Sequence, residues 1–201
     1  MFFFFTKEFH MKVVQKIPGP LVAHKQRGVS LPLIAIILAV SLLLAIAALI
    51  YGPRYIQQTK ADNDVTAIQD LKGQVVKYGG RVGVFNAANS SLAVLVGQGL
   101  FPRSVVGGTQ AAPTVTNEWG GRVTVAVGTV NTAGDSIVFT RTAVPEVGCT
   151  LVGTSMDDLA ETVVIGATTT KTPGARSNAA AVNTACRAGG NNNTMVVTIA
   201  R

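Results

Sequence analysis

The feature that most constrains this 201-residue chain is an uncharged, apolar stretch near its amino terminus. From Leu31 to Tyr51, 21 consecutive positions carry no charged side chain, and most of them are Leu, Ile, Ala or Val. As an α-helix rising about 1.5 Å per residue, this stretch is about 31 Å long, close to the thickness of a bilayer's hydrocarbon core. The sequence therefore predicts a helix that is stable in lipid or in a bundle of similar helices.

A short basic segment precedes this stretch. Residues 1–28 carry five Lys or Arg and one Glu, so they contribute +4 to the formal net charge of +7. This bias is expected to keep the segment on the cytoplasmic side of a membrane. The later Lys and Arg are scattered and are not interleaved with aromatic residues, which argues against a nucleic-acid-binding surface. Both histidines, His10 and His24, lie in this segment, so the chain after residue 28 has no histidine for catalysis or metal binding.

Two cleavage sites compete at the apolar stretch. A cut after Gly28 removes a leader of residues 1–28 and leaves the helix on a mature chain that begins at Val29. A secretory signal peptidase would instead cut after the small-x-small sequence that ends at Ala47. The stretch stays apolar beyond Ala47, and a helical pattern resumes after Pro53, so the cut after Gly28 is favoured.

The apolar helix is predicted over residues 29–53 and an amphipathic helix over residues 54–80. Pro53, after Gly52, removes one backbone hydrogen bond and predicts a kink; the alternative is that the pair ends one helix and starts another. Gly79-Gly80 is expected to end the amphipathic helix. Its apolar stripe is Ala61, Val65, Ile68, Leu71 and Val75, and its surface residues are Asp62, Asp64, Asp70 and Lys72.

Residues 81–201 are predicted to form a globular α+β head domain. A run with period-two alternation and a second run after a turn predict a β-hairpin. Two loops are expected. One is a Gly/Pro/Thr-rich segment between a helix at 90–98 and the hairpin, and the other is a polar segment at residues 168–178. The predicted elements are helix 90–98, strands 122–127 and 136–142, a helix whose first turn holds Pro145, strand 162–165, helical turns at 179–186 and strand 195–199.

The two cysteines, Cys149 and Cys186, lie far beyond the apolar stretch, and two thiols in an exported domain indicate one disulfide. Chain entropy alone would make a bridge of this loop length worth about 4 kcal/mol. A redox or metal pair is disfavoured, because the cysteines lack CxxC spacing.

Two further features have both a functional and a structural interpretation. Asp157, Asp158 and Glu161 are oxygen donors of the type that bind calcium, but they lack EF-hand spacing, so a solvated surface is expected. Trp119 precedes two glycines and is expected to anchor the core and not to form a sugar-binding platform.

Several short motifs occur along the chain in a characteristic order. They are Arg27-Gly28, Gly52-Pro53, Ile68-Gln69-Asp70-Leu71, Gly99-Leu100-Phe101-Pro102, Asn117-Glu118-Trp119-Gly120-Gly121, Val144-Pro145 with Cys149, and Cys186 before a final strand. No single motif is specific, but in this order the chain resembles the type IVb pilins over essentially its whole length. The PilS-like thin-pilus subunits of conjugative plasmids are the most similar group.

The resemblance implies a type IV pilin fold, an α+β structure in which a long N-terminal helix packs on an antiparallel β-sheet and a disulfide staples the C-terminal region. It also implies that prepilin peptidase cuts between Gly28 and Val29 and methylates the new amino terminus. The subunit would be anchored in the bacterial inner membrane, then assembled by the pilus machinery with copies of itself into an extracellular filament for adhesion, aggregation or conjugative mating. It implies no cofactor, no metal and no catalysis.

One position departs from the family pattern. Typical pilins carry glutamate at the fifth mature position, whereas this chain has Leu33 there, after an unusual Pro32. An apolar residue does not harm the helix, because a carboxylate in an apolar core is costly. It does leave a neighbouring subunit's terminal amine without that partner. The alternatives are therefore a minor pilin or a pseudopilin of a type II secretion system, and, if the helix is removed, a secreted binding module.

Overall fold

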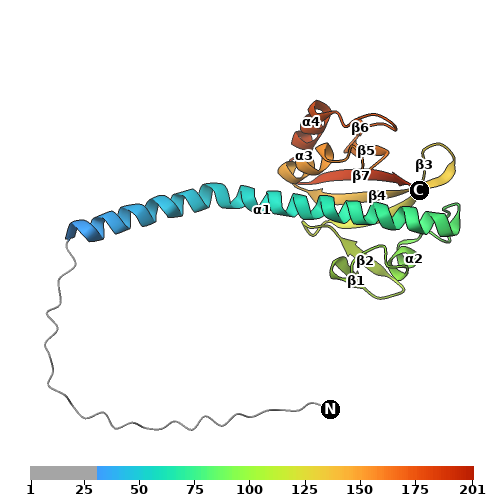
Figure 1. Cartoon of the computed structure of the whole chain (residues 1–201), viewed down its shortest axis with the longest axis horizontal. Helices are drawn as coiled ribbons and strands as arrows, with labels where there is room; N and C mark the ends of the chain where they lie inside the picture. Colours follow the sequence, from blue (N-terminus) through green and yellow to red (C-terminus); the bar gives the residue numbers. More distant parts are fainter. Residues whose placement is uncertain (1–30) are drawn as a thin grey trace, which may run out of the picture. The chain divides into compact units, whose positions relative to one another are not determined.

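The structure, a computed structural model, describes residues 31–201. The chain divides into two units at Leu44, and helix α1 (Leu31–Val82) contributes to both. In the first unit, the described residues 31–44 are all helical and exposed. The second unit holds the rest of α1 together with the whole sheet (Figure 1).

The sheet is antiparallel throughout and, within the described residues, has seven strands in the order β1-β2-β3-β4-β7-β5-β6. The central pair, β4 and β7, comes from distant parts of the chain. The final strand, β7, lies between β4 and β5 and joins the two parts of the sheet. The strands are β1 (Val106–Gly108), β2 (Pro113–Thr116), β3 (Arg122–Thr129), β4 (Ala133–Val144), β5 (Thr162–Ile165), β6 (Thr168–Lys171) and β7 (Asn193–Ala200).

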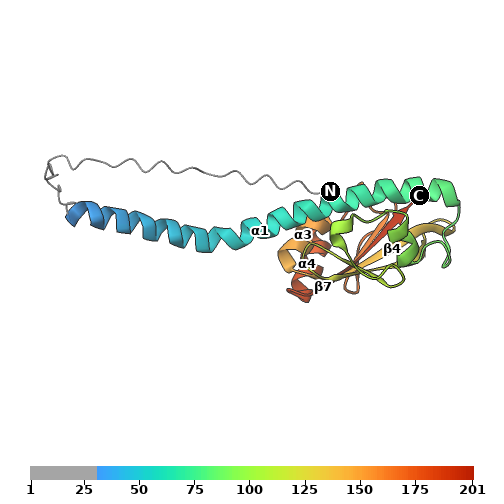
Figure 2. The ribbon, with the colours of Figure 1, turned by 90° about the horizontal axis from the view of Figure 1, so that it is seen from below.

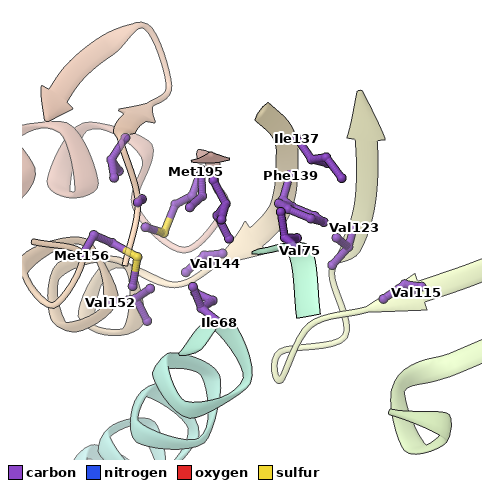
Figure 3. Packing of buried hydrophobic residues seen from close by; sticks show 14 of the residues in the cluster. Ile68, Val75, Val115, Val123, Ile137, Phe139, Val144, Val152, Met156 and Met195 are labelled. Atoms are coloured by element: carbon purple, nitrogen blue, oxygen red, sulfur yellow. The ribbon is translucent and has the colours of Figure 1, made fainter. Parts of the chain in front are cut away.

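The carboxy-terminal part of α1 lies along one face of this sheet, as the two perpendicular views show (Figures 1 and 2). One hydrophobic cluster joins the helix to the strands. Figure 3 shows Ile68 and Val75 of α1 in this cluster together with Phe139 and Val144 of β4. This arrangement confirms the predicted fold class, a long N-terminal helix on an antiparallel sheet.

The three short α-helices of the described residues lie near the expected helical segments, with small differences at their ends. Helix α2 (Leu92–Gly97) has Ser91 as its N-cap, and Gly99 follows it with a φ of 76°. Helices α3 (Glu146–Thr154) and α4 (Ala179–Gly189) lie in the carboxy-terminal half, and η1 (Arg103–Val105) is a single 3₁₀ turn. Pro145 was expected in the first turn of α3 but is its N-cap. This position suits proline, because the start of a helix does not use the backbone N–H that proline lacks.

Helix α1 continues to Val82, so the prediction that Gly79-Gly80 ends it was wrong. Gly79 is buried, and a β-carbon there would lie 2.6 Å from Cβ of Arg201. The glycine is therefore needed for close packing against the chain's last residue. The helix ends one residue before Gly83, whose φ of 73° is left-handed.

Two segments expected to be loops contain short strands. The Gly/Pro/Thr-rich segment after α2 holds β1 and β2, and residues 168–171 of the expected polar loop form β6. β1 and β6 are the two edge strands, and β2 lies between β1 and β3. With three or four residues each, the three strands are too short for a period-two pattern to stand out from the loop sequence around them.

The turn between β3 and β4 is organised by Asp135. Its carboxylate accepts hydrogen bonds from the backbone N–H groups of Val130, Asn131 and Thr132, at 2.7–2.8 Å. Burial by itself would raise the pKa of Asp135, but these donors outweigh it and lower the pKa to about 2. The carboxylate thus stays ionised and holds the turn at ordinary pH.

Candidate functional site

The predicted processing site, Gly28 and Val29, lies outside the described residues. Its cleavage and methylation stay predictions. The described structure begins two residues later, at Leu31.

The amino-terminal half of α1 exposes an unusual amount of apolar surface. Within the described residues, α1 is the helix long and apolar enough to cross a membrane, and its most apolar 18-residue window has a mean hydropathy of 3.2 with none of it buried. Leu31 is 84% exposed and Leu49 is 78% exposed. Leu33, at the position where typical pilins carry glutamate, is 49% exposed and adds to the same apolar surface. Soluble monomers seldom expose a continuous apolar surface of this kind.

The helix is continuous through Gly52-Pro53. Pro53 lies inside α1, so the alternative in which the pair ends one helix and begins a second does not hold. Gly52 has open space around it, which means that no packing contact requires a glycine there. The kink predicted for this pair remains a prediction, because a proline here still removes a backbone donor.

The second half of α1 packs against the sheet through the predicted stripe. Ala61, Ile68 and Val75 are buried, and Val65 and Leu71 are half-buried against the same cluster. The spacing of seven between the buried positions keeps them on one face of the helix. The amphipathic pattern is thereby confirmed.

The prediction that Asp64 lies on the surface was wrong. Asp64 is 1% exposed and forms an ion pair with Arg141 on β4. The position is three residues after Ala61 and four before Ile68, so it belongs to the apolar stripe by helical spacing. That spacing was the available signal. The partner, 77 residues away, could not be inferred from the local pattern.

The Asp64–Arg141 pair links α1 to β4 inside the core. Removing either partner would leave an uncompensated charge in the core, which is strongly destabilising. Asp64 Oδ2 and Arg141 Nη1 are also buried and have no hydrogen-bond partner among the described residues.

The Asn117–Gly121 motif forms a turn that ties the sheet to α1. The Asn117 carboxamide oxygen accepts from the backbone N–H groups of Trp119 and Gly121, at 3.1 and 2.8 Å. The indole N–H of Trp119 donates to the side-chain oxygen of Gln57 on α1, at 2.8 Å. Trp119 is half-buried and packs beside Gly148, where a β-carbon would lie 2.3 Å from the ring. The tryptophan therefore serves as a structural anchor.

Cys149 of α3 and Cys186 of α4 form the predicted disulfide, with Cα atoms 5.7 Å apart. Both residues are completely buried. The Asn193 carboxamide, at the start of β7, donates to the Cys186 carbonyl at 3.0 Å. The bridge and this contact connect both helices to the last strand.

The acidic residues near α3 have structural contacts. Asp157 accepts from the Ser177 backbone N–H at 2.6 Å, and the Lys72 ammonium donates to the Asp158 carbonyl. No cluster of three metal-ligating side chains occurs among residues 31–201. The polar residues predicted to be solvated therefore also attach the segment after α3 to its surroundings.

Comparison with solved structures defines the class of fold. The chain is similar to the crystal structure of a type IV b pilin from Salmonella typhi, with 20% identity and a TM-score of 0.54, covering 70% of this chain and 99% of that one. It is also similar to the crystal structure of TcpA, a type IV pilin from the Vibrio cholerae El Tor biotype, with 15% identity and a TM-score of 0.52, covering 70% of this chain and 98% of that one. This chain thus has the type IV pilin fold.

The sequence comparison narrows the class to a family. A search of curated protein sequences gives no significant match. A family model described as PilS N terminal matches residues 57–200, from the packed half of α1 to the end of β7. The chain belongs to the PilS family.

Proposed function

We propose that this chain is a structural subunit of a type IVb pilus and has no catalytic activity. Prepilin peptidase removes residues 1–28 and methylates Val29, the apolar helix holds the subunit in the inner membrane, and the subunit then joins an extracellular filament of its own copies. The observation that carries the proposal is the exposed, uncharged amino-terminal part of α1, Leu31 to Tyr51, on a chain whose residues 57–200 match the PilS family model.

The exposed half of α1 suits both stages of this pathway. A helix that is apolar on all sides is stable in lipid, and it is equally stable when identical helices surround it. A head-to-tail contact between subunits that does not close into a ring generates a helical filament. Transfer from membrane to filament therefore requires no refolding of the helix.

Adhesion, aggregation and conjugative mating are the filament functions that the family resemblance suggests. A strain that lacks the chain is expected to lose its filaments and, with them, aggregation or mating in liquid. Complementation with the intact chain restores both. If filaments persist in the deletion strain, the chain is not the main subunit.

A minor pilin is the second candidate, and Leu33 is the observation that favours it. Without a carboxylate at this position, a neighbour's terminal amine lacks the partner that typical pilins supply. Quantitative mass spectrometry of sheared filaments separates the two roles. A major subunit makes up most of the filament protein, whereas a minor subunit is a small fraction of it.

The intact mass of the chain from its native host tests the processing step. A mass for residues 29–201 plus one methyl, rising by two hydrogens after reduction, is expected. A Gly28→Leu variant should keep the uncut mass, because a bulky side chain next to the scissile bond obstructs the peptidase, and a Gly19→Leu control should be cut normally. A mass starting at Ala48 would instead identify a secreted domain, and an uncut native chain would identify a membrane protein whose helix is only an anchor.

A further inference from the structure

Two exposed tyrosines mark the point where the apolar stretch of α1 ends. The 20 positions from Leu31 to Ile50 hold no aromatic residue, and Tyr51 and Tyr55 follow directly after them. Tyr51 is 68% exposed and Tyr55 is 71% exposed, whereas the third tyrosine of the chain, Tyr78, is buried against the head. The exposed tyrosines are therefore confined to one level of the helix.

An exposed arginine, Arg54, lies between the two tyrosines on the helix surface. The tyrosines are four residues apart and Arg54 follows Tyr51 by three, which are the spacings of neighbours on a helix. Tyr55 lies six residues before the buried Ala61, a rotation of about 120° around the helix axis, so it is turned away from the sheet. Tyr51, Arg54 and Tyr55 thus form one exposed Tyr-Arg cluster.

Pro53 makes the same level of the helix unsuited to the interior of a bilayer. It has no backbone N–H, so the Leu49 carbonyl loses its helical donor. An unsatisfied carbonyl is costly among lipid tails, whereas water at the membrane surface can hydrogen-bond to it. The proline therefore favours a membrane boundary close to Tyr51.

We propose that the Tyr-Arg cluster binds the phospholipid headgroups of one leaflet and sets the depth of the subunit in the membrane, an inference that rests on the membrane stage of the proposed function. The 21 apolar positions span about 31 Å as a helix and fill the hydrocarbon core, which leaves the cluster at its boundary. Tyrosine suits this boundary because its ring is apolar and its hydroxyl needs a polar partner.

The charge around the cluster fits lipid phosphates. Residues 51–61 carry two basic side chains, Arg54 and Lys60, and no acidic one. Arginine forms strong, charge-assisted hydrogen bonds with phosphate oxygens. The long side chain of Arg54 can reach these oxygens while its methylene groups stay against the apolar surface.

The cluster brings one end of the head close to the headgroups. Gln57 is two residues beyond Tyr55, which is about 3 Å of helix rise. Its side-chain oxygen accepts a hydrogen bond from the indole of Trp119 at 2.8 Å, and the indole ring packs on Gly148 of α3. Trp119 is therefore held near the level of the cluster.

The test uses Trp119, the single tryptophan of the chain, as a depth probe. The full chain is placed in nanodiscs of phosphatidylcholine and phosphatidylglycerol that carry a nitroxide either on the headgroup or midway along the acyl chain. We expect the headgroup nitroxide to quench Trp119 fluorescence severalfold more than the acyl nitroxide does. In the control variant Trp119→Phe/Val84→Trp, the probe lies past the far end of α1, about 40 Å of helix from Tyr55, and neither nitroxide should quench it.

The cluster itself is tested with the variant Tyr51→Leu/Arg54→Leu/Tyr55→Leu. These substitutions extend the uncharged apolar stretch to Ile56, which adds about 8 Å of helix. The longer stretch should draw the head into the bilayer surface, so the acyl nitroxide should quench Trp119 about as strongly as the headgroup nitroxide.

The matched variant is Asp62→Leu/Thr66→Leu. It changes two exposed positions that are four residues apart on the same helix, but polar residues separate them from the apolar stretch. It should therefore keep the wild-type quenching pattern.

Three results would overturn the proposal. Wild-type Trp119 that neither nitroxide quenches would place the head away from the lipid. Stronger quenching by the acyl nitroxide in the wild type would place the membrane boundary beyond the cluster. A cluster variant with the wild-type pattern would show that these residues do not set the depth. A chain that fails to enter the nanodiscs at all would instead refute the membrane stage of the proposed function, so the two failures are distinguished.

Discussion

The buried Asp64–Arg141 pair makes the sharpest stability prediction for this fold. Replacing Arg141 with methionine leaves the Asp64 carboxylate, 1% exposed, without its counter-charge. Breaking a buried pair in this way typically costs about 3–5 kcal/mol. Asp64→Leu should cost a similar amount, because it leaves the guanidinium of Arg141, which is 6% exposed, without its counter-charge. The double variant Asp64→Leu/Arg141→Met replaces both charges with apolar side chains and should lie within about 1–2 kcal/mol of the wild type.

The double-mutant cycle is measured by urea unfolding of residues 54–201, from which the exposed apolar part of α1 is removed. The coupling free energy between the two positions should be several kcal/mol, since the single effects do not add. The pair Asp62→Leu/Arg122→Met, at exposed positions, is the control and should show additive, small effects. If each single substitution costs less than about 1 kcal/mol, or if the double variant costs the sum of the two, the pair does not hold the helix on the sheet.

Three further predictions concern other parts of the head. The Cys149→Ser/Cys186→Ser variant should lose about 4 kcal/mol of unfolding free energy, and a reductant should have no further effect on it. A loss below about 1 kcal/mol would contradict the expected contribution of the disulfide. Asp135→Asn should lose about 1–2 kcal/mol at neutral pH. The pKa of Asp135 is about 2 in the folded protein and 3.8 ordinarily, so its contribution to stability is present above pH 3.8 and is lost as the pH falls through 2. The stability of the Asp135→Asn variant should therefore depend less on pH in this acid range than that of the wild type. Gly148→Ala places a methyl against the Trp119 ring and should lower the free energy of unfolding by about 1–3 kcal/mol. Gly80→Ala is the control: it has open space at a helical position, so it should be neutral or stabilise the fold by up to about 1 kcal/mol. Equal effects of the two substitutions would contradict the close packing of Trp119 on Gly148.

The exposed apolar helix was determined by the sequence alone. Its identity follows from 21 uncharged positions, and no tertiary contact is needed to hold an α-helix whose backbone groups pair within it. The amphipathic stripe, the strands near 122–127 and 195–199 and the cysteine pair were predicted for similar reasons. In each, local periodicity or residue type carries the information.

The tertiary structure decided the features that depend on distant partners. Asp64 is charged and helical, and only Arg141, 77 residues later, makes its burial tolerable. Gly79 lies inside the helix, and its missing side chain leaves the room that Arg201, the last residue of the chain, occupies. The short strands β1, β2 and β6 have only three or four residues each, too few to show a period, and they form by pairing with neighbouring strands of the sheet. A sequence pattern reports which face of an element is apolar, but which group lies opposite that face is fixed only when the chain has folded.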